Sequence, residues 1–295
     1  MKDATRLDFR RRPSAVPYMV RAMLPVSRQR DLKPRISAQW RGHQPDPREL
    51  AAFGRITGLE SAAAGLPLLY PHTFGFRLAM AILTHPRFPV PIWGVLQTRN
   101  HLLQHRPIAI GEPLDFEVSV VDGRAVAKGA EFDLRTTVQV GGMLAWESVL
   151  TFFARGRFGD PHPASPLVRA PTEFGSPVAD WVMRDADHWR FGGFTGDYNG
   201  IHMWDWYAHR LGFRRALYHP PRVLGECLAR LAPPARVEDG RGRLRFDAWL
   251  KGPVPHGATV RMHASTTATA TTFALFAGED RPCIVGQLTV PEETG

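Results

Sequence analysis

Cysteine is scarce in this sequence, and long apolar runs are absent. Cys227 and Cys283 are the only two cysteines among 295 residues, too few for a disulfide framework or for a zinc site with four cysteine ligands. A reducing environment fits this usage. No window offers the roughly 18 uninterrupted apolar residues that a membrane-spanning helix needs. The sequence therefore predicts no membrane span.

The N-terminal stretch lacks the features of a secretory signal. It reads MKDATRLDFRRRPSAVPYMVRAML, which is rich in arginine but has no uninterrupted apolar core and carries Asp3 and Asp8. Secretory signals combine a basic start with a continuous apolar segment. We therefore expect a cytoplasmic location, with an organellar import segment as the alternative.

The charge of the chain is strongly one-sided. The formal net charge is +9, carried almost wholly by arginine, whereas the 44% of hydrophobic and 22% of charged residues are ordinary for a globular protein. Guanidinium groups suit bidentate binding of phosphate, which favours an anionic partner. The arginines are scattered, however, and none of the basic stretches is interleaved with aromatic residues as a nucleic-acid groove requires. We expect no nucleic-acid partner; the alternative to an anionic ligand is that the charge only maintains solubility.

A proline-rich stretch divides the chain near its middle. Residues 158–177 contain five prolines and no periodic apolar pattern, which is typical of a linker. We interpret residues 1–45 as an N-terminal extension, 46–157 as a first domain, 158–177 as the linker and 178–295 as a second domain.

The two halves share three anchors in the same order, which indicates a duplicated unit. FGRITGLES from Phe53 matches FGGFTGDYN from Phe191, LYPHTFGFRLAMAIL from Leu69 matches LYHPPRVLGECLARL from Leu217, and Gly111 matches Gly257 ahead of a predicted strand. The spacing differs in one place, because Gly58 and Leu69 are 11 residues apart whereas Gly196 and Leu217 are 21 apart. Any chemistry in the longer loop belongs to the second copy alone.

Each copy shows the pattern of helices followed by strands. Asp46, Pro47 and Glu49 form a helix-capping pattern, and Asp185 or Asp187 could cap the matching helix of the second copy. Residues 76–84 are apolar nearly all round, which predicts a helix wrapped by a sheet. Strand-like alternation follows in 114–120, 132–140, 146–155, 244–250, 259–266 and 272–278. Since no helix of crossover length separates these strands, each copy is predicted to be an α+β unit with an antiparallel sheet around a central helix.

Polar side chains gather in one short loop of the second half. The stretch GFTGDYNGIH places Asp197, Asn199 and His202 within six residues, where Gly196 and Gly200 allow the chain to turn. Histidine, with an ordinary pKa of about 6.5, is the natural group to move a proton at neutral pH. An adjacent carboxylate could orient or polarise the reacting groups. The alternative is structural: an aspartate or asparagine that caps a helix, and a histidine that is merely buried.

The same region gives no metal-binding motif. His202, Asp205 and His209 follow one another on the predicted helix, but their spacing drifts across its face and does not match a histidine pair four residues apart. We expect neither a metal nor another cofactor.

The stretch FTGDYNGIHMWDWYA resembles the signature of the (R)-specific enoyl-CoA hydratases and MaoC-like dehydratases, in which G-D-x-N-x-x-H leads into a helix. In the first half, LPLLYPHTFGFRLAMAIL and FPVPIWGVLQTRNHLLQHRPIAIGE resemble the non-catalytic repeat of double hot-dog members, so that the resemblance covers roughly residues 50 to 290. It implies a double hot-dog fold, in which two sheets, each wrapped around one helix, pack side by side. The first repeat would lack the catalytic loop.

The resemblance also implies an activity. Members of the family add water to a trans-2-enoyl thioester or, in reverse, dehydrate a (3R)-3-hydroxyacyl thioester. Matched by position, Asp197 and His202 are the implied acid/base pair, with Asn199 and Gly196 supporting the loop. The implied substrate is a thioester of coenzyme A or of an acyl carrier protein, and a homo-oligomer of double hot-dog protomers is also implied.

The sequence departs from the family where the thioester oxygen should be bound. Family members donate to this oxygen from the backbone N–H of a glycine that follows a histidine at the start of the central helix. Here His219 is followed by Pro220 and Pro221, which have no N–H, and the next donor is Arg222. The alternatives are an enzyme whose donor is the Arg222 amide or a side chain, an enzyme of weak activity, and a non-catalytic acyl-CoA-binding or partner protein that keeps the hot-dog fold.

Overall fold

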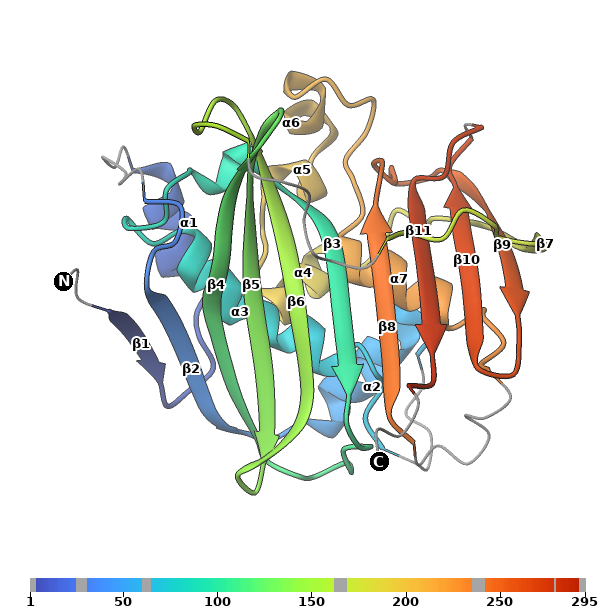
Figure 1. Cartoon of the computed structure of the whole chain (residues 1–295), viewed down its shortest axis with the longest axis horizontal. Helices are drawn as coiled ribbons and strands as arrows, with labels where there is room; N and C mark the ends of the chain where they lie inside the picture. The colour runs from blue at the N-terminus through green and yellow to red at the C-terminus, as the bar shows by residue number, and fades with distance from the viewer. Residues whose placement is uncertain are drawn as a thin grey trace.

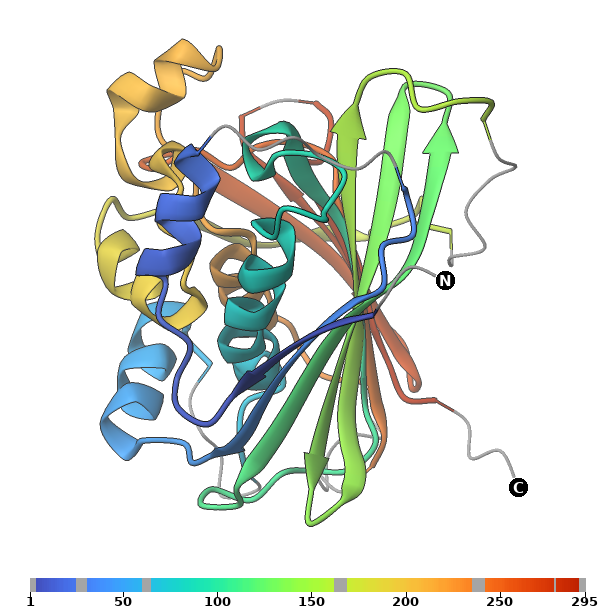
Figure 2. The same ribbon diagram turned by 90° about the vertical axis from the view of Figure 1, so that its left-hand side faces the viewer.

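The computed structural model describes residues 4–24, 31–59, 65–161, 169–234, 242–278 and 280–291. Within these ranges eleven strands form one continuous sheet, and the helices lie together on one of its faces (Figure 1 and Figure 2). None of the helices in the described ranges is long and apolar enough to cross a bilayer. The α+β class predicted from the sequence is confirmed.

The first half contributes six strands and the second half five. The elements of the first half are β1 (Thr5–Phe9), α1 (Val16–Met23), β2 (Ile36–His43), α2 (Pro47–Thr57), α3 (Tyr70–Leu83), a short 3₁₀ helix (Ile92–Gly94), β3 (Val95–Gln104), β4 (Leu114–Val126), β5 (Gly129–Val140) and β6 (Met143–Arg155). Those of the second half are β7 (Ser176–Val182), α4 (His188–Thr195), α5 (Gly200–Met203), α6 (Asp205–Arg210), α7 (Pro220–Leu228), β8 (Leu244–Leu250), β9 (Thr259–Thr266), β10 (Ala270–Phe276) and β11 (Ile284–Thr289).

The strand order is mirrored about the middle of the sheet. The first half runs β2-β4-β5-β6-β3, the second continues β8-β11-β10-β9-β7, and β1 is added parallel to β2 at the outer edge. The other neighbouring strands pair antiparallel. In each half the strand after the central helix, β3 or β8, lies at the joint. The predicted duplication and the double hot-dog fold are confirmed.

Matched glycines end the corresponding helices α2 and α4. Gly58 and Gly196 adopt left-handed φ angles of 75° and 74°. Their N–H groups donate to the carbonyls of Gly54 (2.7 Å) and Gly192 (2.8 Å). Glycine reaches this conformation without the cost that a Cβ imposes. The shared F-G-x-x-T-G pattern therefore encodes the same helix end twice, and in the second copy the chain then enters the loop that carries Asp197.

The central helices α3 and α7 each pack closely against a neighbouring element because each has a glycine at the point of contact. Every residue of α3 is buried, as its apolar pattern predicts. A Cβ added to Gly75 of α3 would lie 3.1 Å from the ring of Phe116 on β4, and one added to Gly225 of α7 would lie 2.8 Å from Thr57 of α2. The second contact ties the central helix of one repeat to the first helix of the other.

A buried hydrogen bond joins the two halves where β3 meets β8. His101 Nδ1 donates to Asp247 Oδ1 at 2.7 Å, and Asp247 also accepts from Arg245 Nε (2.8 Å) and Gln287 Nε2 (3.1 Å). Burial raises the pKa of Asp247, but these hydrogen bonds outweigh burial and lower the pKa below its ordinary value. A charged carboxylate is therefore held at the joint.

The predicted N-terminal extension is corrected by the structure. β2 pairs with β4, and its residues Ile36, Ala38 and Trp40 are buried in the core. In ISAQWRGH apolar residues alternate with polar ones at the strand period, which buries one face of the strand. Residues before 46 therefore belong to the sheet: β2 from Ile36 and, at its outer edge, β1 from Thr5.

Two further predictions concern the linker and the residues that cap helices α2 and α4. The predicted linker already contains the first residues of β7, which begins at Ser176, and its residues 162–168 lie outside the described ranges. Asp46 caps α2 by accepting from Arg48 N and Glu49 N, as predicted. Asp187 occupies the same position before α4 but makes no capping bond, since its left-handed φ of 61° turns the side chain elsewhere.

Candidate active site

The loop after α4 is fixed by its own polar side chains. Thr195 Oγ1 accepts from the N–H of Asp197 (3.1 Å), Asp197 Oδ1 accepts from that of Asn199 (3.0 Å), and Asn199 Oδ1 accepts from that of Ile201 (3.2 Å). Each side chain thus binds the backbone two residues further on, a local pattern that stabilises turns and helix starts. The result is a rigid turn from Gly196 into α5, with Asn199 as the N-cap.

Asp197 and His202 face each other across this turn. Asp197 Oδ2 lies 3.6 Å from His202 Nε2, and the two side chains are 14% and 12% exposed. His202 Nδ1 lies 2.9 Å from the carbonyl oxygen of Leu217. A carbonyl can only accept, so Nδ1 carries the proton and Nε2 of the neutral ring presents a lone pair. Two hydrogen-bond acceptors, Asp197 Oδ2 and His202 Nε2, therefore lie close together.

His219, directly before α7, packs against both residues. Its ring stacks on that of His202, with centroids 4.2 Å apart and planes 25° apart. Its Nε2 donates to the backbone carbonyl of Asp197 at 3.0 Å. Burial, helped by the neighbouring His202, lowers the pKa of His219 well below the ordinary value of histidine. His219 is consequently a neutral ring that holds the loop against the central helix.

The start of α7 offers no free backbone donor. Pro220 and Pro221 occupy its first two positions and lack an N–H. The N–H of Arg222 donates to the carbonyl of His219 at 3.0 Å, as does that of Val223 at 3.2 Å. The Arg222 amide, considered from the sequence as the nearest remaining donor, is therefore already occupied. The start of α7 therefore provides no backbone donor for a thioester oxygen.

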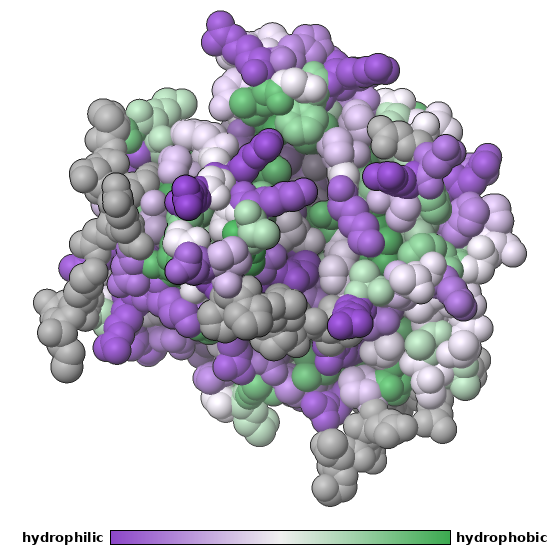
Figure 3. All heavy atoms as spheres, turned by 45° about the horizontal axis from the view of Figure 1, so that its top comes forward, coloured by the Kyte–Doolittle hydropathy of each residue, from purple (hydrophilic) through white to green (hydrophobic). Residues whose placement is uncertain are grey.

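The Asp197 and His202 side chains border a cavity of about 610 Å³ between the two halves. Its wall is mostly apolar and includes Phe76, Met80, Phe152, Val223, Leu250 and Ile284. The volume is in the usual range for pockets that hold organic ligands. Figure 3 shows the top of the molecule, with hydrophobic and hydrophilic residues side by side around a hollow near its upper centre. An apolar chain can therefore be enclosed beside the polar pair.

Polar side chains interrupt the apolar wall, and three of them could bind the polar part of a ligand. Gln97 Nε2, on β3, is buried and has no hydrogen-bond partner among the described residues. Asn199 also lines the cavity, and its capping bond uses only Oδ1. Lys251, directly after the end of β8, is exposed. The cavity thus has amide donors within its wall and a cation at its surface.

Sequence reasoning missed Arg77, which positions the loop from the first repeat. This residue of α3 is buried, and it donates to the carbonyls of Phe194 (3.0 Å), Pro13 (2.6 Å) and Gly193. Burial lowers its pKa to about 10, so it remains charged at neutral pH. Two of its acceptors are in the last turn of α4, where free carbonyls attract cations. The available signal was one arginine within an otherwise apolar helix, since buried charges have partners.

Among the residues that the structure describes, two groups of side chains could offer ligands to a metal ion. Asp197, His202 and His219 form one, and Asp185, His188 and His256 form the other. In the first group the stacked rings of His202 and His219 direct their in-plane lone pairs along nearly parallel planes, so these do not converge on one ion. This arrangement suits proton transfer better than metal binding. His209, by contrast, bonds the Arg214 carbonyl and is in neither group.

The chain has a curated relative of known type, although no family model matches it. The 3-hydroxyacyl-thioester dehydratase X (HtdX) of Mycobacterium tuberculosis (strain ATCC 25618 / H37Rv) is 30% identical over 259 residues, which span 86% of this chain and 89% of the relative. The crystal structure of HtdX has a TM-score of 0.71 at 25% identity and covers 86% of this chain and 100% of its own.

Two solved structures of lower identity share the fold. A MaoC-like dehydratase from Phytophthora capsici has a TM-score of 0.66 at 18% identity, covering 87% of this chain and 96% of its own. A Mycobacterium tuberculosis protein with a double hot-dog fold has a TM-score of 0.54 at 16% identity, covering 84% and 93%. Since the identity to HtdX extends over most of both chains and the folds agree, this protein belongs to the MaoC-like dehydratase family.

Proposed function

We propose that this protein is a hydro-lyase that interconverts trans-2-enoyl and (3R)-3-hydroxyacyl thioesters. The observation that carries the proposal is the pair formed by Asp197 Oδ2 and His202 Nε2, two acceptors 3.6 Å apart beside an apolar cavity. Its family membership and the dehydratase activity named for its relative support the same reaction.

The pair suits the activation of water. A water molecule has two protons, and a water between these groups could donate one to Asp197 Oδ2 and one to His202 Nε2. Its oxygen lone pairs would then be free to attack the β-carbon of an enoyl thioester. As the C–O bond forms, His202 takes the proton that the water loses, and its Nε2–H then supplies a proton to the α-carbon. Dehydration is the reverse.

The developing charge on the thioester oxygen needs a donor. Because the start of α7 presents no free N–H, we assign this role to an amide side chain of the cavity wall, with Gln97 Nε2 as the first candidate and Asn199 Nδ2 as the second. Gln97 is the stronger candidate because its Nε2 is buried without a partner, a costly arrangement unless a ligand completes it.

The substrate is proposed to be an acyl thioester of coenzyme A or of an acyl carrier protein. The apolar wall fits the acyl chain, and Lys251 at the surface, with the arginine-rich charge of the chain, fits an anionic carrier. A cytoplasmic location and a homo-oligomer of such protomers stay predictions from the sequence.

The direct test is hydration of crotonyl-CoA and of longer trans-2-enoyl-CoAs by the purified chain, followed by loss of enoyl thioester absorbance. We expect turnover to depend on chain length, because the cavity is apolar and of limited volume. A folded protein that turns over neither coenzyme A nor carrier-protein thioesters of any length would contradict the proposal.

The second candidate function is acyl binding without turnover. It is favoured by Pro220 and Pro221 and by the occupied N–H of Arg222, since these remove the family's backbone donor. Calorimetric binding of acyl-CoA by a folded protein that shows no hydration or dehydration would establish it. Robust turnover would exclude it.

A further inference from the structure

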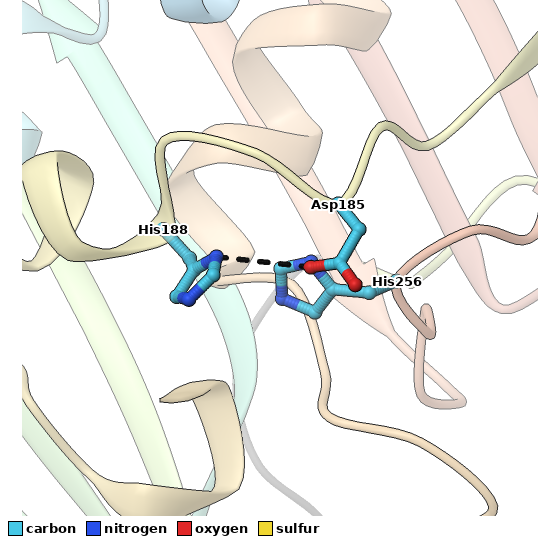
Figure 4. A group of neighbouring side chains, drawn as sticks. All are labelled: Asp185, His188 and His256. Atoms are coloured by element: carbon cyan, nitrogen blue, oxygen red, sulfur yellow. Dashed lines mark ion pairs between the residues drawn. The ribbon is translucent and has the colours of Figure 1, made fainter. Parts of the chain in front are cut away.

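A second polar cluster lies outside the catalytic loop. Asp185 comes from the connection between β7 and α4, His188 is the first residue of α4, and His256 comes from the loop between β8 and β9. Figure 4 shows the carboxylate of Asp185 beside the rings of both histidines. Asp185 Oδ1 lies 3.3 Å from His256 Nδ1 and 3.8 Å from His188 Nδ1. The proposed hydratase reaction leaves this cluster without a role.

His256 is buried in a way that its protein neighbours do not explain. Its side chain is 1% exposed, and neither ring nitrogen has a hydrogen-bond partner among the described residues. His188 Nδ1 is also buried without one. Buried polar atoms are nearly always paired, because an unpaired one loses its hydration without replacement. Although Nδ1 of His256 is close to Asp185 Oδ1, the two are not aligned as donor and acceptor.

Two of the separations, 3.3 and 3.8 Å, are near those of ligands around one small cation. Two ligand atoms about 2.1 Å from a tetrahedral zinc ion lie about 3.4 Å from each other. The three ligand atoms of the cluster all lie within 4.8 Å of one another. The rings of His188 and His256 are 79° apart, with centroids 5.2 Å apart, so that their in-plane lone pairs can converge. Burial lowers the pKa of His256 to about 4, which leaves its ring neutral and able to ligate.

Neighbouring side chains are compatible with an ion at this place. Arg215 donates to Asp185 Oδ2 at 2.9 Å, which leaves Oδ1 as the oxygen that faces the histidines. The guanidinium of Arg222 donates to the carbonyl of Ala186 (2.5 Å) and lies over the ring of Tyr218. The positive charges of Arg215 and Arg222 reduce the affinity for a metal ion, but neither guanidinium occupies the place of a ligand atom. Asp185 is 47% exposed, which gives an ion access from solvent.

We propose that Asp185, His188 and His256 bind one divalent transition-metal ion of the zinc type, with water as a fourth ligand. Two imidazoles and one carboxylate are ligands that zinc, cobalt(II) and nickel(II) accept. The ion would tie the β7–α4 connection to the β8–β9 loop. His256 also packs on Tyr218, with centroids 4.6 Å apart, and Tyr218 lines the cavity. A bound ion therefore braces the wall of the catalytic cavity from outside.

The test uses the full chain, freed of metal by a chelator and of any affinity tag. Zinc chloride is titrated by calorimetry, and cobalt chloride by the visible absorption of the four-coordinate ion. We expect one equivalent to bind, to raise the melting temperature, and to give a cobalt spectrum without thiolate bands, since Cys227 and Cys283 are buried and outside the cluster. No binding at metal concentrations up to about 1 mM would overturn the proposal.

Variants locate the ion. Asp185→Asn and His188→Gln change partly exposed residues and should each weaken zinc binding by more than about tenfold, whereas His263→Gln on β9 and His202→Gln in the catalytic loop should not. His256→Gln should behave as His188→Gln does; if it fails to fold, the first two variants decide. Unchanged binding in both of them, or loss of binding in His202→Gln, would overturn the assignment.

Discussion

The imidazole of His219 lies against that of His202, with ring centroids 4.2 Å apart, and the same His219 donates to the backbone of Asp197. One neutral ring thus contacts both members of the proposed acid/base pair. Its neutrality matters because a second cation at this distance would oppose protonation of His202 during water activation. Burial, which lowers the pKa of His219, therefore also serves the proposed chemistry.

Removal of either proposed proton-transfer group should abolish most of the activity. Asp197→Asn and His202→Asn are each expected to lower kcat for crotonyl-CoA hydration by about 10² to 10⁴, the usual contribution of acid–base catalysis. Initial rates across substrate concentrations measure this. His209→Asn is the matched control, because His209 is exposed and bonds only the Arg214 carbonyl. Equal rates in all variants would remove the pair from the mechanism.

Arg77 should influence both stability and turnover, although it is in the first repeat and the proposed acid/base pair is in the second. Arg77→Met keeps the apolar stem but leaves the carbonyls of Pro13, Gly193 and Phe194 without their donor. Buried acceptors without partners cost about 1 to 3 kcal/mol each, so we expect a loss of about 3 kcal/mol or more in the free energy of unfolding.

Displacement of the α4 end in Arg77→Met should also lower kcat, since misplaced catalytic groups lose rate steeply. Urea unfolding and steady-state kinetics measure the two effects. Arg55→Met on the exposed face of α2 is the control, with an expected change within about 0.5 kcal/mol. If Arg77→Met is as stable and active as the control, the loop does not depend on this arginine.

The fold could be predicted from the sequence largely because it is encoded twice. The pattern F-G-x-x-T-G marks the left-handed ends of α2 and α4, and the apolar helix 76–84 marks the centre of a hot-dog unit. The strand β2 was missed because it precedes FGRITGLES, the first stretch that the two halves share. Its inward face is also only partly apolar. The strand β3 was not assigned because its residues NHLLQ mix polar and apolar side chains at the joint.

The candidate site was only partly predictable, for a physical reason. Asp197, Asn199 and His202 are close in sequence, so their loop could be recognised. Gln97 and Arg77 approach from the other repeat, and contacts across such distances in sequence leave no local pattern. The occupied N–H of Arg222 depends on backbone geometry that residue names do not reveal.

Stability should fall in mild acid because of His72. This histidine of α3 is buried, and burial lowers its pKa from 6.5 to about 4. The unfolded chain therefore binds this proton more readily than the folded one. The stabilising contribution is complete above about pH 6.5 and is lost as pH falls towards 4, by up to about 1.4 kcal/mol per pH unit.

Unfolding free energies of the wild type and of His72→Gln, measured in urea at several pH values in this window, test that expectation. As pH falls, the free energy of unfolding of His72→Gln should decline less steeply than that of the wild type, by up to about 1.4 kcal/mol per pH unit. Parallel declines in the two proteins would show that His72 does not contribute to the pH dependence.

Substitution of Pro220 tests how the developing charge on the thioester oxygen is stabilised. Pro220→Ala and Pro220→Gly each restore an N–H at the first position of α7, which lines the cavity and where the helix dipole favours negative charge. One such donor typically contributes about 10² to 10³ in rate. Because the restored N–H would add a second donor beside the side-chain donor assigned above, we expect both variants to raise kcat for enoyl-CoA hydration, and Pro220→Gly to cost about 1 kcal/mol of stability through the freer unfolded chain.

The alanine variant separates the two effects of that substitution, because it regains the donor with less backbone freedom than glycine. Steady-state kinetics on a good enoyl thioester and urea unfolding measure them. If both variants fold but are no faster than the wild type, the thioester oxygen is already held by a side chain. Gln97→Met, which keeps the length of the side chain and removes its buried donor, should then lower kcat by about the same 10² to 10³. A Gln97→Met protein with wild-type kcat would leave Asn199 Nδ2 as the remaining amide donor in the cavity wall.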